Sequence, residues 1–187
     1  MAKLYFYHGA MGSSKTAQAL MTDYNYTERN QKPLLVKTDI DKRDGQRIVR
    51  SRIGLQKECI LLSELCGMTN EDLSQYDAII VDEIQFATKE QIDFLADIVD
   101  KLNIPVLCFG LRTDFKMNLF EGSERLIAIA DEIREVVTVC WCGRKAICNA
   151  RYNENGIIKK GEQIELGAND KYIALCRRHY KEGKLTK

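Results

Sequence analysis

The sequence predicts an α/β fold in which a parallel sheet is covered by helices on both faces, followed by a small β domain. Short apolar runs of strand length alternate with helical patterns up to about residue 135. A glycine-containing loop joins the first apolar run to the first helical pattern, and two carboxylates follow the most apolar run. After Glu135 the sequence changes to short β-prone pieces separated by turn residues.

The connection between the first strand and the first helix has the pattern of a phosphate-binding loop. The β-prone run 4–7 precedes it, and apolar residues at helical spacing follow it. The loop consists of Gly9, Ala10, Met11, Gly12, Ser13, Ser14, Lys15 and Thr16. Backbone N–H groups of such a loop, with the N-terminus of the helix, bind phosphate oxygens. We expect Lys15 to contact the outer phosphates of a nucleoside triphosphate and the Thr16 hydroxyl to reach Mg²⁺.

Ser14 departs from the usual form of this loop, which has glycine immediately before the lysine. Glycine suits that position because it allows a positive φ and a close approach of the backbone to phosphate. We expect Ser14 to be accommodated with some strain and Gly12 to take up part of the turn. The alternative is a βα turn that binds nothing.

The remaining elements follow in order from the same patterns. We expect the first helix to end near Arg29, and a short helix near 70–75 capped by Thr69 or Asn70. Thr88 and Gln91 form a capping box that begins a longer helix. Strands are expected at 34–36, 60–62, 78–81 and 105–110, and a last helix at 123–133. The arginine-dense segment 39–52 is either a solvated loop or part of the site, because ligands bind at the carboxyl ends of parallel strands.

Asp82 and Glu83 end the continuous apolar run 78–81, which is typical of a central parallel strand. In a phosphate-loop enzyme an aspartate at this position belongs to the magnesium shell. A second carboxylate beside it can take the proton of an attacking hydroxyl as general base. Two adjacent acids can also be plain surface residues. Their occurrence together with the phosphate loop favours a catalytic role.

Four potential metal ligands occur in two close pairs near the C-terminus. They are Cys140, Cys142, Cys176 and His179. A structural Zn²⁺ held by three thiolates and one imidazole would stabilise a β domain that is too small for a core of its own. The alternative is two unrelated pairs, because C-x-C is tighter than the usual spacing. The other cysteines lie among apolar residues and are expected to be reduced thiols.

The overall composition limits the classes of function. The 28 basic and 27 acidic residues nearly balance, which argues against a nucleic-acid-binding protein or a protein of anionic membranes. No apolar stretch has the length of a membrane span. The first residues lack the basic-then-apolar pattern of a signal peptide, so we expect a cytoplasmic protein with no nucleic-acid or membrane partner.

Taken together, these motifs resemble the type II thymidine kinases, the zinc-containing cellular and bacterial class, over essentially the whole chain. The resemblance rests on the loop ending in Lys15 and Thr16 and on the strings 40–43, 81–86, 110–115, 140–146 and 176–180. It implies a P-loop NTPase-like α/β fold with a zinc-binding β lasso domain. We place the kinase domain at residues 1–138 and the lasso domain at 139–187.

The resemblance implies ATP-dependent phosphorylation of the 5′-hydroxyl of thymidine or deoxyuridine. Glu83 would be the base, Asp41 would join Thr16 and Asp82 in the magnesium shell, and Arg43 would reach phosphate. The lasso would span about 153–172 and read the base largely by main-chain contacts. The implied nucleoside-binding residues are Met11, Phe86, Leu111, Phe115, Gln163, Ile164, Glu165, Leu166, Gly167 and Tyr172.

Family resemblance also implies a homotetramer and feedback inhibition by the end product dTTP. The family has glycine where this chain has Ser14, which affects ATP affinity and turnover more than the fold. Two rival interpretations therefore stay open. One is a nucleotide sensor or nucleic-acid-binding protein that has lost turnover, and the other is an ATP hydrolase of the general phosphate-loop type.

Overall fold

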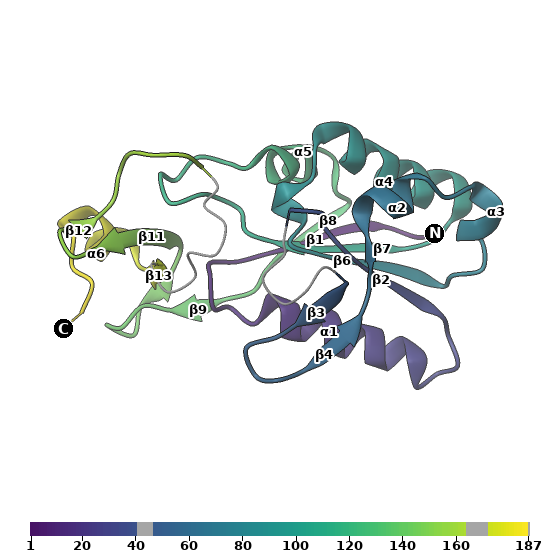
Figure 1. The fold of residues 1–187 in the computed structure, drawn as a ribbon, viewed down its shortest axis with the longest axis horizontal. Helices are drawn as coiled ribbons and strands as arrows, with labels where there is room; N and C mark the ends of the chain where they lie inside the picture. The colour runs from purple at the N-terminus through teal and green to yellow at the C-terminus, as the bar shows by residue number, and fades with distance from the viewer. Residues whose placement is uncertain (41–46, 164–171, 187) are drawn as a thin grey trace.

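In the computed structural model, residues 1–40, 47–163 and 172–186 are described. Six strands among them form one sheet in which every neighbouring pair is parallel (Figure 1). In spatial order the strands are β5 (Ile60–Leu61), β2 (Pro33–Lys37), β6 (Ala78–Asp82), β7 (Val106–Gly110), β1 (Leu4–His8) and β8 (Glu132–Glu135). This confirms the predicted parallel α/β sheet.

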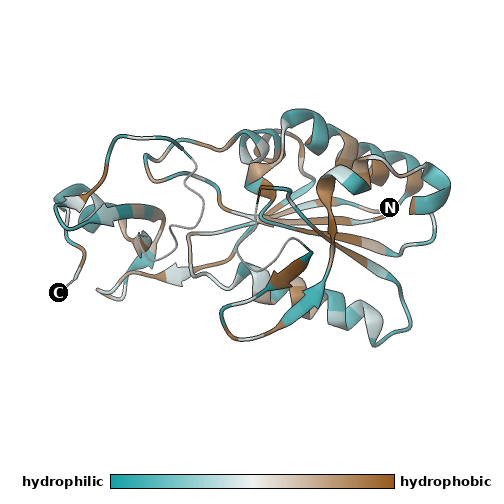
Figure 2. Ribbon diagram, viewed as in Figure 1, coloured by the Kyte–Doolittle hydropathy of each residue, from teal (hydrophilic) through white to brown (hydrophobic). Residues whose placement is uncertain are grey.

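Helices cover both faces of the sheet, as predicted (Figure 1). On one face lie α1 (Lys15–Thr27) and an antiparallel hairpin of β3 (Ile48–Arg50) and β4 (Gln56–Glu58). On the other face lie α2 (Leu62–Cys66), α3 (Asn70–Leu73), α4 (Lys89–Leu102) and α5 (Glu121–Ile129). Strand β6 contributes Ile79 and Val81 to one hydrophobic cluster and Ala78 and Ile80 to the other, because successive side chains of a strand point to opposite faces. Apolar residues are visible along β2 and in the centre of the sheet in Figure 2.

Local capping explains where two helices begin. The Thr88 side chain accepts a hydrogen bond from the N–H of Gln91, and the Gln91 side chain accepts one from the N–H of Thr88. This is the predicted capping box of α4. Thr69 and Asp72 make the same reciprocal pair at α3. Helix α4 ends at Asn103, whose φ of 56° is typical of a left-handed C-terminal residue.

Some sequence-based assignments differ from the structure. The predicted helix 123–133 begins two residues earlier and ends at Ile129, and residues 132–135 form the edge strand β8 beside β1. The strand 60–62 ends at Leu61, and Leu62 begins α2. The polar segment 39–52 is not simply a loop, because Val49 of β3 is buried against the side of the sheet that carries α1. Alternation of polar and apolar residues in the short strands is too brief to be read from sequence.

The C-terminal elements lie beyond the carboxyl ends of the sheet strands, at the left in Figure 1. A hairpin of β9 (Thr138–Val139) and β10 (Lys145–Ala146) precedes a three-stranded antiparallel sheet with order β12–β11–β13. These strands are β11 (Cys148–Asn153), β12 (Gly156–Ile157) and β13 (Tyr172–Leu175), and α6 (Arg177–Glu182) follows them. Their hydrophobic cluster has five buried members among the described residues. The domain boundary at 138 stays a prediction.

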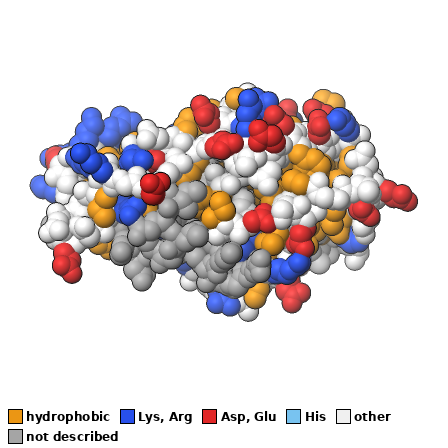
Figure 3. Space-filling view, turned by 45° about the horizontal axis from the view of Figure 1, so that its top comes forward, with side chains coloured by type: hydrophobic (Ala, Val, Ile, Leu, Met, Phe, Trp, Pro, Cys, Tyr) orange, Lys and Arg blue, Asp and Glu red, His pale blue; other side chains and the backbone are white. Residues whose placement is uncertain are grey.

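The surface is mixed in charge, as expected for a net charge of +1. In the view of Figure 3, Lys and Arg side chains gather over the C-terminal elements, whereas Asp and Glu side chains are spread over the helices of the larger part. Within the described part of the chain, no helix has both the length and the apolar character that a membrane span requires.

Candidate active site and metal centre

The phosphate loop connects β1 to α1 at the carboxyl edge of the sheet. The Lys15 side chain is buried, and its Nζ donates hydrogen bonds to Gly9 O at 3.2 Å, Ala10 O at 2.9 Å and Ser13 Oγ at 3.1 Å. The loop therefore curves around the ammonium group. This arrangement places one positive charge at the start of a helix, where backbone N–H groups also favour an anion.

Two residues in the loop have a positive φ, as the sequence pattern suggested. Gly12 has φ 73° and Ser14 has φ 64°. Ser14 occupies the left-handed region at the N-cap of α1, and its side chain caps no backbone N–H. A residue other than glycine in this region costs about 1–2 kcal/mol. The loop thus turns through positive φ at Gly12 and Ser14 and carries the expected strain at Ser14.

Gly9 is required for a different reason. A Cβ at this position would lie 2.3 Å from the carbonyl oxygen of Val136 and 2.6 Å from Ser13 Oγ. Contacts this short do not occur in folded proteins, so the residue that follows β1 must be glycine if the backbone at Val136 is to keep its place. The Val136 N–H in turn donates to His8 O at 2.7 Å.

Asp82 links the end of β6 to the phosphate loop. The Thr16 hydroxyl and the Lys15 ammonium lie close to its carboxyl, and both favour the charged form. The carboxyl is only 5% exposed. Burial, together with the neighbouring Glu83 charge, raises the pKa of Asp82 to about 7 despite these favourable contacts. A desolvated carboxyl beside a hydroxyl supplies oxygen ligands of the kind that Mg²⁺ takes, so these residues fit that ion.

Glu83 follows β6 directly, and its side chain is held in place by Gln85. Glu83 is half-buried and has φ 54° at the start of the short 3₁₀ helix η1 (Ile84–Phe86). The buried Gln85 amide donates from Nε2 to Glu83 Oε2 and accepts at Oε1 from the N–H of Leu111 at 2.9 Å. Because Leu111 can only donate there, the amide nitrogen must face Glu83. The Gln85 amide therefore positions the Glu83 carboxylate, and a positioned carboxylate can act as a general base.

The segment after β7 contains several of the predicted nucleoside-binding residues. Leu111 is half-buried, and its carbonyl accepts from Ser123 Oγ at 2.6 Å. The Phe115 ring is buried under the guanidinium of Arg151, which lies 5.0 Å from the ring centroid. Phe115 O also accepts from Tyr180 of α6 at 2.6 Å. The segment is therefore held from both the larger sheet and the C-terminal elements.

Four other predicted contacts lie around this segment. Met11 and Phe86 are half-buried, and the Phe86 ring meets Phe120 edge-on at 5.8 Å. Gln163 Nε2 donates to Asp114 Oδ2 at 3.1 Å. Gln163 therefore lies beside the segment after β7. Tyr172 begins β13 opposite Arg151. The remaining predicted site residues lie outside the described residues: Asp41, Arg43, Ile164, Glu165, Leu166 and Gly167.

The predicted zinc ligands come together in the C-terminal elements. The ligand atoms of Cys140, Cys142, Cys176 and His179 all lie within 4.8 Å of one another. Cys140 Sγ lies 3.4 Å from His179 Nδ1, and the sulfurs of Cys142 and Cys176 are 4.0 Å apart. Two sulfurs that each lie 2.3 Å from a tetrahedral Zn²⁺ are separated by about 3.8 Å. Three thiols and one imidazole at this spacing fit zinc.

The surroundings of Cys140 favour the thiolate form of this residue, which is the form that binds metal. Burial opposes ionisation of Cys140, but hydrogen bonds from the backbone of Cys142 and Cys176 and from His179 lower the pKa of its thiol to about 6. The Trp141 ring stacks on the His179 ring, with centroids 4.0 Å apart and an interplanar angle of 8°. This stacking fixes the orientation of the imidazole.

Comparison with known proteins identifies the family. The model of the family described as thymidine kinase matches residues 2–180. A thymidine kinase of Haemophilus influenzae is 47% identical over 188 residues, covering 97% of each chain. One of Mannheimia succiniciproducens is 46% identical over 193 residues and 99% of each chain, and one of Zymomonas mobilis is 47% identical over 188 residues. The chain belongs to the thymidine kinase family. This confirms the family that the motifs indicated.

Two residues of this thymidine kinase family member were given no role from sequence, although each bridges parts of the site. One is Gln85, described above. The other is Asn149 of β11, which bonds to the backbone of both Met11 and Thr113. The available signal for Asn149 was a single amide within the β-prone run 146–152, and the signal for Gln85 was its place two residues after Glu83. Neither signal reveals the bonding partner.

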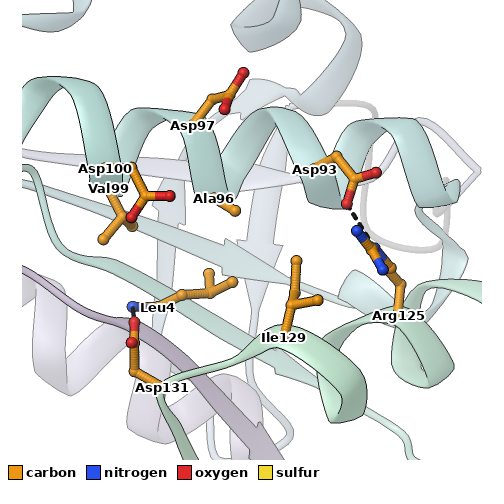
Figure 4. A pocket seen from close by; sticks show the side chains of 9 residues that line it. All are labelled: Leu4, Asp93, Ala96, Asp97, Val99, Asp100, Arg125, Ile129 and Asp131. Carbon is orange, nitrogen blue, oxygen red and sulfur yellow. Dashed lines mark hydrogen bonds and ion pairs between the residues drawn. The ribbon is translucent and has the colours of Figure 1, made fainter.

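A separate pocket of about 400 Å³ lies between α4, α5 and the start of β1 (Figure 4). It faces the opposite edge of the sheet from the phosphate loop, because Leu4 begins β1 whereas the loop follows the end of that strand. Asp93 pairs with Arg125 at 2.6 Å, and Asp131 accepts from the Leu4 N–H at 2.7 Å. The pocket contains none of the residues assigned to phosphoryl transfer in the thymidine kinase family member.

Proposed function

We propose that this chain is a thymidine kinase that transfers the γ-phosphoryl group of ATP to the 5′-hydroxyl of thymidine or deoxyuridine, giving dTMP or dUMP for nucleotide salvage. Family membership supports the activity, and a kinase family implies ATP as donor. The observation that carries the proposal is the contact between the Thr16 side chain and the Asp82 carboxyl beside Lys15. It joins a triphosphate-binding loop to a strand end that carries the candidate base.

In this mechanism the loop Gly9–Thr16 binds the phosphates with its backbone N–H groups, and Lys15 contacts the transferring phosphoryl group. The Glu83 carboxylate takes the proton of the 5′-hydroxyl while the oxygen forms its bond to the γ-phosphorus. The bond to the bridging oxygen breaks in line, and ADP leaves. Gln85 orients the Glu83 carboxylate during this step.

Thr16 and Asp82 would hold Mg²⁺, together with Asp41 from the segment outside the described residues. When bound, the ion neutralises charge on the phosphate oxygens. Arg43 would contribute a further positive charge at the phosphates. The Asp82 carboxylate is buried and has lost its hydration, so a bound cation would compensate a large cost and would be held strongly there.

The nucleoside would bind between the segment 111–115, Met11 and the lasso that contains 163–167 and Tyr172. Main-chain groups of a lasso can pair with the uracil-type edge of the base, and a wrong base then leaves buried polar groups unpaired. The bond from Gln163 to Asp114 supports this placement, because it ties the lasso to the segment after β7. A structural Zn²⁺ on Cys140, Cys142, Cys176 and His179 would hold the domain that carries the lasso.

Three further expectations come from the family resemblance and belong to the same proposal. The protein is a cytoplasmic enzyme, it assembles as a homotetramer, and dTTP inhibits it by occupying the site. Size-exclusion chromatography with light scattering measures the assembly. Inhibition of the initial rate by added dTTP, with and without excess thymidine, measures the feedback.

Phosphorylation of radiolabelled thymidine by the purified chain tests the activity. Glu83→Gln keeps the size of the side chain and removes the base, so transfer should fall by a factor of at least about 10² while thymidine binding persists. ATP turnover that proceeds equally without a nucleoside would instead favour the hydrolase interpretation. Wild-type turnover by the variant would show that another group is the base.

A further inference from the structure

We propose that Asn149 is a positioning residue that fixes the separation between the phosphate loop and the nucleoside-binding segment 111–115. The inference rests on the proposed kinase activity and adds a role for a residue of the C-terminal elements. Asn149 is the second residue of β11, opposite Ala174 of β13, and is only 2% exposed. Both ends of its side-chain amide bind backbone groups of the larger part of the chain.

Asn149 accepts one of the two hydrogen bonds and donates the other. Asn149 Oδ1 accepts from the N–H of Met11 at 2.8 Å, and Asn149 Nδ2 donates to the carbonyl of Thr113 at 2.9 Å. A short side chain that accepts on one side and donates on the other is required here, and asparagine meets that requirement. An aspartate carboxylate only accepts, and an aliphatic residue of similar size does neither.

The Met11 end of this bridge acts on the site for phosphate. Met11 follows Ala10, whose carbonyl accepts from Lys15 Nζ at 2.9 Å. The orientation of the peptide unit between Ala10 and Met11 is therefore fixed on both sides, by the ammonium group at the carbonyl and by Asn149 at the N–H. Rotation of this unit would move the phosphate-binding N–H groups of the loop.

The Thr113 end acts on the site for the phosphoryl acceptor. Thr113 lies two residues after Leu111, whose N–H binds the same Gln85 amide that holds Glu83. Asn149 thus completes a series of contacts between the phosphate loop and Glu83, the candidate general base. The series passes through β11 and the segment after β7. Phosphoryl transfer is sensitive to this separation, since a displacement of 1 Å can lower a rate by about 10²-fold.

Two substitutions at Asn149 test its two hydrogen bonds individually. Asn149→Asp keeps the acceptor for Met11 and places a carboxylate oxygen against the Thr113 carbonyl, whereas Asn149→Leu removes both bonds. Both variants should lower kcat for thymidine phosphorylation at least tenfold. The KM for ATP should rise more than threefold in Asn149→Leu, which frees the Met11 peptide, and stay within threefold of wild type in Asn149→Asp. Thr69→Ala is the matched control, because it weakens the cap of α3 far from the site and should lower Tm without changing kcat.

Hydrogen exchange gives a readout that does not depend on activity. In Asn149→Leu, peptides that contain the Met11 amide and the segment 111–115 should exchange faster than in wild type. In Asn149→Asp, faster exchange should be confined to 111–115. A kcat within twofold of wild type in the Leu variant, or unchanged exchange at Met11, overturns the positioning role. A wild-type chain that fails to phosphorylate thymidine instead refutes the proposed function, and hydrogen exchange still tests the bridge.

Discussion

The Thr16 side chain lies close to the Asp82 carboxyl, although the two residues belong to strand–helix units separated by β7 in the sheet. Because β1, β7 and β6 are parallel, their carboxyl ends lie at one edge, where the phosphate loop and the acidic strand end meet. The kinase proposal required this proximity, and an arrangement at opposite edges would have excluded it.

Asp82→Asn should stabilise the protein at alkaline pH in the absence of magnesium. The pKa of Asp82 is raised from its usual 3.8 to about 7, mainly by burial. An acid with a raised pKa contributes stability that is fully present below pH 3.8 and is lost as the pH rises through 7. The Tm of the variant relative to wild type should therefore be higher at pH 8.5 than at pH 6, as measured by thermal unfolding. An equal difference at both pH values would contradict the assignment.

The same substitution should weaken the response to magnesium. Wild-type Tm should rise when Mg²⁺ and a non-hydrolysable ATP analogue are added, because ligands that bind only the native state stabilise it. Asp82→Asn should show a smaller rise and a kcat lower by at least about 10². Asp97→Asn, on the exposed side of α4, is the control and should behave as wild type.

Ser14→Gly should tighten ATP binding or leave it unchanged. The positive φ of Ser14 is strained for a serine and relaxed for a glycine, so the folded loop gains about 1–2 kcal/mol. The greater freedom of glycine in the unfolded chain offsets part of this gain. Isothermal titration with an ATP analogue measures the affinity, and Ser14→Ala separates loss of the hydroxyl from relief of strain. A large loss of affinity in the glycine variant would show that the loop binds phosphate in another geometry.

Gln85→Leu should lower kcat about tenfold with little effect on the KM for ATP. The substitution removes the donor to Glu83 and leaves the Leu111 N–H without its acceptor. Steady-state kinetics with both substrates measures the split between kcat and KM. Gln91→Leu, which breaks only the capping box of α4, should lower Tm without this effect on kcat.

Removal of zinc should change the fluorescence of Trp141, the chain's single tryptophan. Its ring stacks on His179, so loss of the metal should loosen the stack and shift the emission. We expect about one Zn²⁺ per chain by metal analysis and a loss of both metal and activity in Cys140→Ser. Cys66→Ser lies outside the cluster and should keep its zinc. Full zinc content in Cys140→Ser would refute the ligand set.

The parts of the site that are local in sequence could be predicted, and the parts that depend on tertiary contacts could not. The loop, the acidic strand end and the two cysteine-containing pairs are each encoded within eight residues. Gln85 binds Leu111, 26 residues away, as well as its neighbour Glu83, and the partners of Asn149 lie 36 or more residues away, so no local pattern predicts these contacts. Even the strain at Ser14 was predictable, because a phosphate loop fixes the sign of φ at that position.

The errors in the fold have the same cause. The predicted helix 123–133 included the first two residues of strand β8. The structure ends that helix at Ile129, and the Asp131 carboxyl then binds the N–H of Leu4 at the start of β1. Pairing with a distant strand thus overrode the local pattern.

The contact of Gly9 with the Val136 carbonyl has a consequence for chimeric enzymes. The peptide that leads from β8 to the zinc-binding elements runs alongside the phosphate loop, with the Thr138 hydroxyl 3.5 Å from Gly12 O. Suppose that the C-terminal part were exchanged with that of a relative. The phosphate loop would then keep its conformation only if the junction preserved the length of the segment 133–139. An inserted residue there would move the Val136 backbone away from Gly9. Deletion of a residue from 133–139 would displace the phosphate loop.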